Sequence, residues 1–138
     1  MWNHEVSADT EAPLEAVWAQ YVDLSGWPKW NPGTQKIELK GAFATGSEGV
    51  ITSAAYGDVP FKLASVVDKE SFVIESPVNE DVVLRTSCHV AALPSGGARI
   101  THRMELEGPG SEQMGATLGE DLSKNLAAGA QALVEAAA

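Results

Sequence analysis

The last third of the chain places its most regular strand pattern directly before its longest helical pattern. Apolar residues and one histidine occupy alternate positions there: Ile100, His102, Met104 and Leu106. This period of two predicts a strand with one buried face. A break at residues 108–110 follows, and from Glu112 to about Glu135 apolar residues recur at helical spacing. Such an ending predicts a long helix that packs its apolar stripe against a sheet.

The rest of the chain supplies the other strands of that sheet. Residues 2–9 alternate in the same way, and residues 13–22 carry one apolar helical face. Pro28 and Pro32 push the residues before them towards extended geometry, so residues 23–33 predict an irregular aromatic segment. Short alternating segments separated by turns fill residues 36–92. Consecutive strands joined by short turns indicate an antiparallel sheet with one solvent-facing side.

Alternating residues in the middle of the chain predict two further strand faces. Val50, Thr52, Ala54 and Tyr56 are expected to share a face of one strand. In the next strand, Phe61, Leu63, Ser65 and Val67 are expected to share a face, in alternation with Lys62 and Asp68.

Length and charge narrow the class of protein. The 138 residues predict a single domain over 1–138. The net charge of −10 disfavours nucleic acid and anionic membrane surfaces as partners. No apolar run is long enough to cross a bilayer, and the first residues do not resemble a signal peptide. We therefore expect a cytoplasmic protein without membrane insertion, either a monomer or a homodimer.

Motifs for metal, nucleotide or nucleophilic chemistry are missing from the sequence. The three histidines lack metal-ligand spacing, and Cys88 is the only cysteine. The segment Gly41–Gly46 lacks the lysine of a phosphate-binding loop, and no Gly-x-Ser-x-Gly motif occurs. We expect no metal and no cofactor.

Three local motifs resemble a known superfamily. Ala12–Trp18, Asp23-Leu24 and Trp27–Pro32 together resemble the opening of the polyketide cyclase/dehydratase-like branch of the START-like (SRPBCC) superfamily. The resemblance implies the helix-grip fold of the α+β class. In that fold a curved antiparallel sheet of about seven strands wraps around a long C-terminal helix, and two short helices follow the first strand. It also implies an apolar cavity between sheet and helix. Members bind lipids, polyketides, hormones and other hydrophobic molecules, and some catalyse cyclisation or dehydration, without a shared catalytic motif.

Glycines on the predicted long helix bear on whether this cavity exists. Gly115 and Gly129 fall near the middle of the apolar stripe, and Gly119 falls at its edge. Each costs the helix roughly 1 kcal/mol relative to alanine. Two interpretations remain open: the small residues leave volume for a ligand, or a sheet residue such as Phe61 or Phe72 packs against the helix backbone.

The candidate site residues are those expected to face the cavity. His102, with Tyr56, is the candidate for proton transfer. The candidate ligand-binding residues are Trp30, Tyr56, Phe61, Thr86, Cys88, His102, Met104, Met114, Leu118 and Leu122. Each has a structural alternative, because an inward histidine, cysteine or methionine can equally be part of the core, and Trp27 and Trp30 can be packing anchors. His4 would approach His102 if the first and last strands pair in the required register.

Two functions follow from these residues and the resemblance. The first is the binding of a hydrophobic small molecule (a lipid, polyketide or aromatic compound) by a carrier or sensor. The alternative is a cyclase/dehydratase-like enzyme in which His102 and Tyr56 move protons while the cavity holds the substrate in a folded conformation.

Overall fold

The computed structural model describes residues 2–30, 34–53, 57–77 and 80–137. Its strands are β1 (Trp2–Thr10), β2 (Thr34–Lys40), β3 (Glu48–Ser53), β4 (Gly57–Val67), β5 (Ser71–Pro77), β6 (Val83–Ala92) and β7 (Ala98–Glu107). Its helices are α1 (Leu14–Val22), the 3-10 turn η1 (Leu24–Gly26), α2 (Trp27–Trp30) and α3 (Ser111–Ala137).

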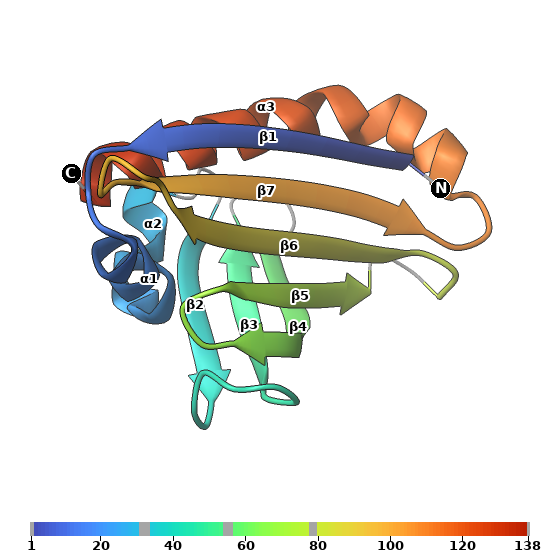
Figure 1. Ribbon diagram of the computed structural model, residues 1–138. Helices are drawn as coiled ribbons and strands as arrows, with labels where there is room; N and C mark the ends of the chain where they lie inside the picture. The colour runs from blue at the N-terminus through green and yellow to red at the C-terminus, as the bar shows by residue number, and fades with distance from the viewer. Residues whose placement is uncertain (1, 31–33, 54–56, 78–79, 138) are drawn as a thin grey trace.

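The strands form one antiparallel sheet in the order β1-β7-β6-β5-β4-β3-β2. The first and last strands are therefore neighbours, with Val6 opposite His102. The sheet curves strongly, and α3 runs along β1 and β7 (Figure 1). This is the helix-grip fold that the resemblance implies. The predicted alternation is confirmed in β1, whose even-numbered residues are half-buried and whose odd-numbered residues are exposed.

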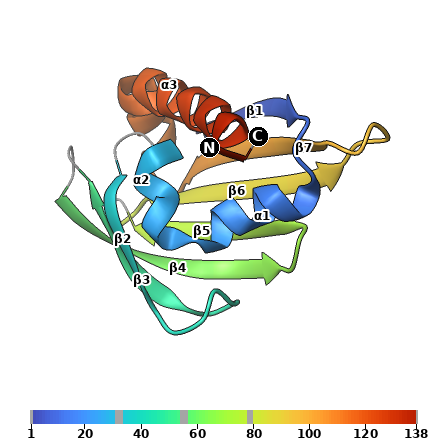
Figure 2. The ribbon, with the colours of Figure 1, turned by 90° about the vertical axis from the view of Figure 1, so that its left-hand side faces the viewer.

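The short helices α1 and α2 cover one end of the curved sheet, below α3 (Figure 2). Val17, Trp18 and Tyr21 of α1 are buried, as their spacing predicts. The expectation of extended geometry at Trp27 is wrong, because its φ and ψ of −56° and −40° are helical. Pro28 is the second residue of a four-residue helix, where its missing N–H removes no intrahelical hydrogen bond.

Trp2 fills the space that two of the α3 glycines leave. A Cβ atom at Gly115 would collide with the Trp2 side chain, and one at Gly119 would lie 2.8 Å from its Nε1 atom. The close approach of the indole explains why the helix tolerates glycine at these positions. For Gly115 and Gly119 the packing interpretation is therefore correct, although the partner is Trp2 of the first strand and neither Phe61 nor Phe72.

Two details of the central strands differ from the sequence pattern. A β-bulge between Leu63 and Ser65 shifts the alternation of β4, so that Val66 pairs with the inward-facing Phe72 and Val67 is 43% exposed. In β3, Gly49 and Ile51 pair with Phe61 and Val59. Val50 and Thr52 share the opposite, convex face of that strand, and Ala54 and Tyr56 lie outside the described residues.

Candidate functional site

The concave face of the sheet carries no aspartate, glutamate, lysine or arginine among the strand residues that the structure describes. The pairing registers place the even-numbered residues of β1, β5, β6 and β7 on this face, together with Gly49 and Ile51 of β3 and Phe61 and Leu63 of β4. Their side chains are apolar, hydroxyl, thiol, thioether or imidazole groups, and the two histidines are His4 and His102. A hydrophobic molecule is the kind of ligand that such a surface suits.

Burial on the concave face is lower around Thr86 and Met104, although Ile74 and Leu106 beside them are buried. On β6, Leu84 and Thr86 are half-buried, whereas Cys88 and Val90 are buried. On β7, Met104 is half-buried beside the buried His102. Thr86 and Met104 lie directly opposite each other in the register. Solvent therefore reaches the inner face around this pair, while side chains fill the end nearer α1.

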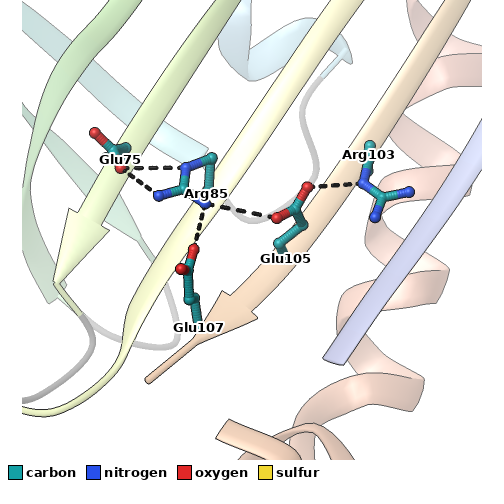
Figure 3. Close-up of polar contacts among 5 residues, drawn as sticks. All are labelled: Glu75, Arg85, Arg103, Glu105 and Glu107. Carbon is teal, nitrogen blue, oxygen red and sulfur yellow. Dashed lines mark hydrogen bonds and ion pairs between the residues drawn. The ribbon is translucent and has the colours of Figure 1, made fainter. Parts of the chain in front are cut away.

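The charged residues of the same strands lie on the convex face. Arg85 bonds Glu75 at 2.8 Å and Glu107 at 2.5 Å, and its guanidinium lies 3.5 Å from Glu105 (Figure 3). Arg103 extends the network through a 2.8 Å bond to Glu105. The hydrogen bonds that Arg85 donates to Glu107 and Glu75 raise the pKa of Arg85 above its ordinary value. This segregation keeps the charges away from the inner surface.

A buried hydrogen bond joins α1 to β7 at the filled end of the concave face. The hydroxyl oxygen of Tyr21 lies 2.8 Å from Nε2 of His102. Tyr21 is fully buried and His102 is 3% exposed. Because a neutral imidazole has one N–H and one bare nitrogen, either group can be the donor, and each arrangement leaves the pair one further donor and one further acceptor.

Burial keeps both members of this pair uncharged at neutral pH. It lowers the pKa of His102 to about 4, because the protonated ring would lose its hydration. Burial also raises the pKa of Tyr21, with a smaller contribution from Cys88. The pKa of the Cys88 thiol is raised by burial as well, so the cysteine is a poor nucleophile.

Aromatic rings surround the Tyr21–His102 pair. We call them the aromatic cluster, and its members are Trp18, Tyr21, Trp27, Trp30, Phe43 and Phe72. The ring centroids of Tyr21 and Phe72 are 4.9 Å apart. Trp30 lies 5.9 Å from Tyr21 and 6.2 Å from His102, again between centroids. The cluster therefore closes one end of the concave face with rigid, mostly apolar surface.

The two tryptophans of α2 differ in their hydrogen bonding. Nε1 of Trp27 donates to the backbone oxygen of Tyr21 at 2.9 Å. Nε1 of Trp30 is buried and has no hydrogen-bond partner within the described part of the chain. Trp27 is thus anchored to α1, whereas Trp30 retains a free donor next to His102.

The structure brings part of the predicted site together. Trp30, Phe61, Cys88 and His102 are buried, and Thr86 and Met104 are half-buried next to Cys88 and His102 along their strands. Met114, Leu118 and Leu122 are half-buried on α3, at the flank of its buried stripe. Tyr56 lies outside the described residues.

The expected approach of His4 to His102 takes a different form. The register places His4 opposite Met104, so the two histidines are diagonal neighbours on β1 and β7. His102 has Tyr21 as its partner instead. The sequence pattern places Tyr21 on the apolar face of its helix and does not distinguish it from the other residues of that face. The available signal was its position on that face, since a buried tyrosine hydroxyl needs a partner.

Two features are absent from the described residues, a metal-binding cluster and a membrane-spanning helix. Within residues 2–30, 34–53, 57–77 and 80–137, no cluster of histidine, cysteine or acidic side chains could hold a metal ion. No helix in those same ranges has the length and apolar character to cross a membrane.

The helix-grip fold and a family model that matches the whole chain place the protein in the START/Bet v1-like (SRPBCC) superfamily. The family model described as polyketide cyclase / dehydrase and lipid transport matches residues 1–138. The chain therefore belongs to this family. A comparison with curated protein sequences finds no match.

Solved structures share the fold at low sequence identity. A solution NMR structure of a protein from Thermobifida fusca is 19% identical, with a TM-score of 0.79 over 99% of this chain and 93% of that one. Truncated norcoclaurine synthase from Thalictrum flavum is 17% identical, with a TM-score of 0.74 over 97% and 91% of the two chains. Ara h 8.0201 is 15% identical, with a TM-score of 0.69 over 97% and 98%.

Proposed function

We propose that this protein binds a hydrophobic small molecule on the concave face, between the sheet and α3, as a carrier or sensor. The observation that carries the proposal is the half-buried pair Thr86 and Met104 on an inner face whose described strand residues include no aspartate, glutamate, lysine or arginine. Met114, Leu118 and Leu122 form the facing wall in this proposal. The family's description, which includes lipid transport, supports the same function.

The driving force would be apolar surface that leaves water. A ligand that buries about 250 Å² gains roughly 6 kcal/mol at about 25 cal/mol per Å². That gain corresponds to a dissociation constant of tens of micromolar, before the entropy cost of association is subtracted. Naphthalene-sized compounds are therefore suitable probes, and larger natural ligands would bind more tightly.

The chemistry of the polar pair favours binding over proton transfer. An efficient general acid or base has a pKa near the working pH. His102, with its pKa lowered to about 4, is far from that value, and Tyr21 is shifted in the opposite direction. In the proposed function His102 and Tyr21 orient a ligand through hydrogen bonds.

A pair of neighbouring substitutions tests the location. Thr86→Trp places a large ring on the concave face, and Ser87→Trp places the same ring on the convex face one residue later. We expect Thr86→Trp to weaken the binding of 1-aminoanthracene at least tenfold, measured by fluorescence titration, and Ser87→Trp to leave it unchanged. Equal affinity in both variants would show that the ligand does not bind between the sheet and α3. Native mass spectrometry of freshly purified protein would in addition reveal a retained ligand by its mass.

A further inference from the structure

The Trp30 indole has an unusual position for a polar group. Trp30 is 4% exposed, and its Nε1 atom is the one buried side-chain nitrogen or oxygen without a hydrogen-bond partner among the described residues. Buried polar groups are normally paired, since an unpaired donor loses its water without compensation. An unpaired donor beside a proposed ligand site is therefore best explained by an acceptor that the ligand brings.

The surroundings of Trp30 indicate what kind of acceptor this is. His102 is uncharged because of its burial, and the described strand residues of the concave face include no lysine or arginine. The other histidine of this face, His4, lies on the edge strand β1 opposite Met104, and the residue opposite His102 is Val6. Arg85 and Arg103 lie on the convex face in bonds to glutamates. A ligand carboxylate at Trp30 would be desolvated without a counter-charge, which is costly. A neutral carbonyl oxygen has no such cost.

We propose that the ligand is a neutral compound with a carbonyl group, whose oxygen accepts a hydrogen bond from Nε1 of Trp30 while its apolar part lies against Thr86 and Met104. The Tyr21–His102 pair adds a second donor at the same end of the face, because either proton arrangement leaves one N–H or O–H free. The inference rests on the proposed binding function and deepens it by naming the ligand class.

Three naphthalenes that differ in one substituent provide the test: 2-acetylnaphthalene, 2-ethylnaphthalene and 2-naphthoate, at pH 7.5. We expect the ketone to bind about fivefold more tightly than the hydrocarbon, which is the effect of one hydrogen bond of ordinary net strength. The carboxylate should bind at least about tenfold more weakly than the ketone. Isothermal titration calorimetry measures all three affinities.

Two matched substitutions locate the donor. Trp30→Phe removes the unpaired N–H and should reduce the preference for ketone over hydrocarbon to less than about twofold. Trp27→Phe makes the same chemical change at an N–H that already has an acceptor, so it should leave the preference unchanged. Circular dichroism verifies the fold of each variant. In the unsubstituted protein, the ketone should shift the indole N–H resonance of Trp30, and the hydrocarbon should not.

The possible outcomes separate this inference from the function on which it rests. If none of the three compounds binds, the proposed function fails. If all bind with equal affinity, or if the carboxylate binds best, the binding function stands and the inference about a neutral carbonyl is wrong. A ketone preference that survives Trp30→Phe, with no change of the Trp30 resonance in the unsubstituted protein, also overturns it.

Discussion

Acid should destabilise this fold by an amount that follows from the burial of His102. The residue is 3% exposed, and burial lowers its pKa from 6.5 to about 4. Between these two values the unfolded chain binds a proton that the folded chain does not bind. The free energy of unfolding therefore falls as the pH decreases through this window, and the contribution of His102 is fully present above pH 6.5.

The size of the effect follows from the interval between the two pKa values. That interval is about 2.5, and each pKa unit corresponds to about 1.36 kcal/mol, which gives roughly 3 kcal/mol. A small domain has a total stability of about 5–15 kcal/mol, so this one residue should be visible in the acid unfolding of the protein.

Urea unfolding of the unsubstituted protein and of His102→Gln, followed by tryptophan fluorescence from pH 7.5 to pH 4, measures the effect. Glutamine can still bond the Tyr21 hydroxyl but does not titrate. Carboxylates titrate in both proteins, so their contribution cancels in the comparison. We expect the unsubstituted protein to lose about 3 kcal/mol more than the variant over this range. Equal losses, or an NMR titration of the folded His102 ring near pH 6.5, would refute the reasoning.

Three further predictions concern packing, surface charge and thiol reactivity. Gly115→Ala should destabilise the protein by about 1–3 kcal/mol in urea unfolding, despite the better helix propensity of alanine, because the added methyl group collides with Trp2. In the double variant, Trp2→Ala should relieve part of that loss. If the losses of stability in the two single variants simply add in the double variant, the contact is contradicted. Arg85→Met should lower the free energy of unfolding by about 1 kcal/mol at low salt and by clearly less in 0.5 M NaCl, because salt screens its ion pairs. Lys124→Met, at an exposed ion pair on α3, should lower it by at most a few tenths of that amount. A decrease at Arg85 that does not depend on salt would argue against the network. Cys88 should react with a chromogenic disulfide reagent only after unfolding in urea, and fast reaction in the native protein would mean that the thiol is accessible.

Local patterns in the sequence predicted most of the fold. The alternation at Ile100–Leu106 and the helical spacing after Ser111 correctly indicated β7 and α3, because each element buries one face. The errors have local causes. The β-bulge in β4 reversed the exposure of Val66 and Val67, and a bulge leaves no signal in a period-two pattern. Trp27 is helical before Pro28, because the steric bias of a proline on the residue before it is a preference and not a prohibition.

The candidate site was harder to predict because its contacts join distant parts of the chain. Tyr21 and His102 are 81 positions apart, and no local pattern relates α1 to β7. The inward direction of His102 followed from alternation, but its partner depended on where α1 lies over the sheet. The contact of Trp2 with Gly115 is of the same kind, since the glycine predicts a close approach and leaves the approaching residue unspecified.

Photolabelling with benzophenone, an apolar aromatic ketone, tests the central claim most directly because it reports where a bound molecule lies. After irradiation and proteolysis, mass spectrometry identifies the labelled residues. We expect labels at Met104, Thr86 or the half-buried α3 residues Met114 and Leu118. An excess of 2-acetylnaphthalene should reduce this labelling. Labels confined to the convex face, or labelling that competition does not reduce, would contradict it.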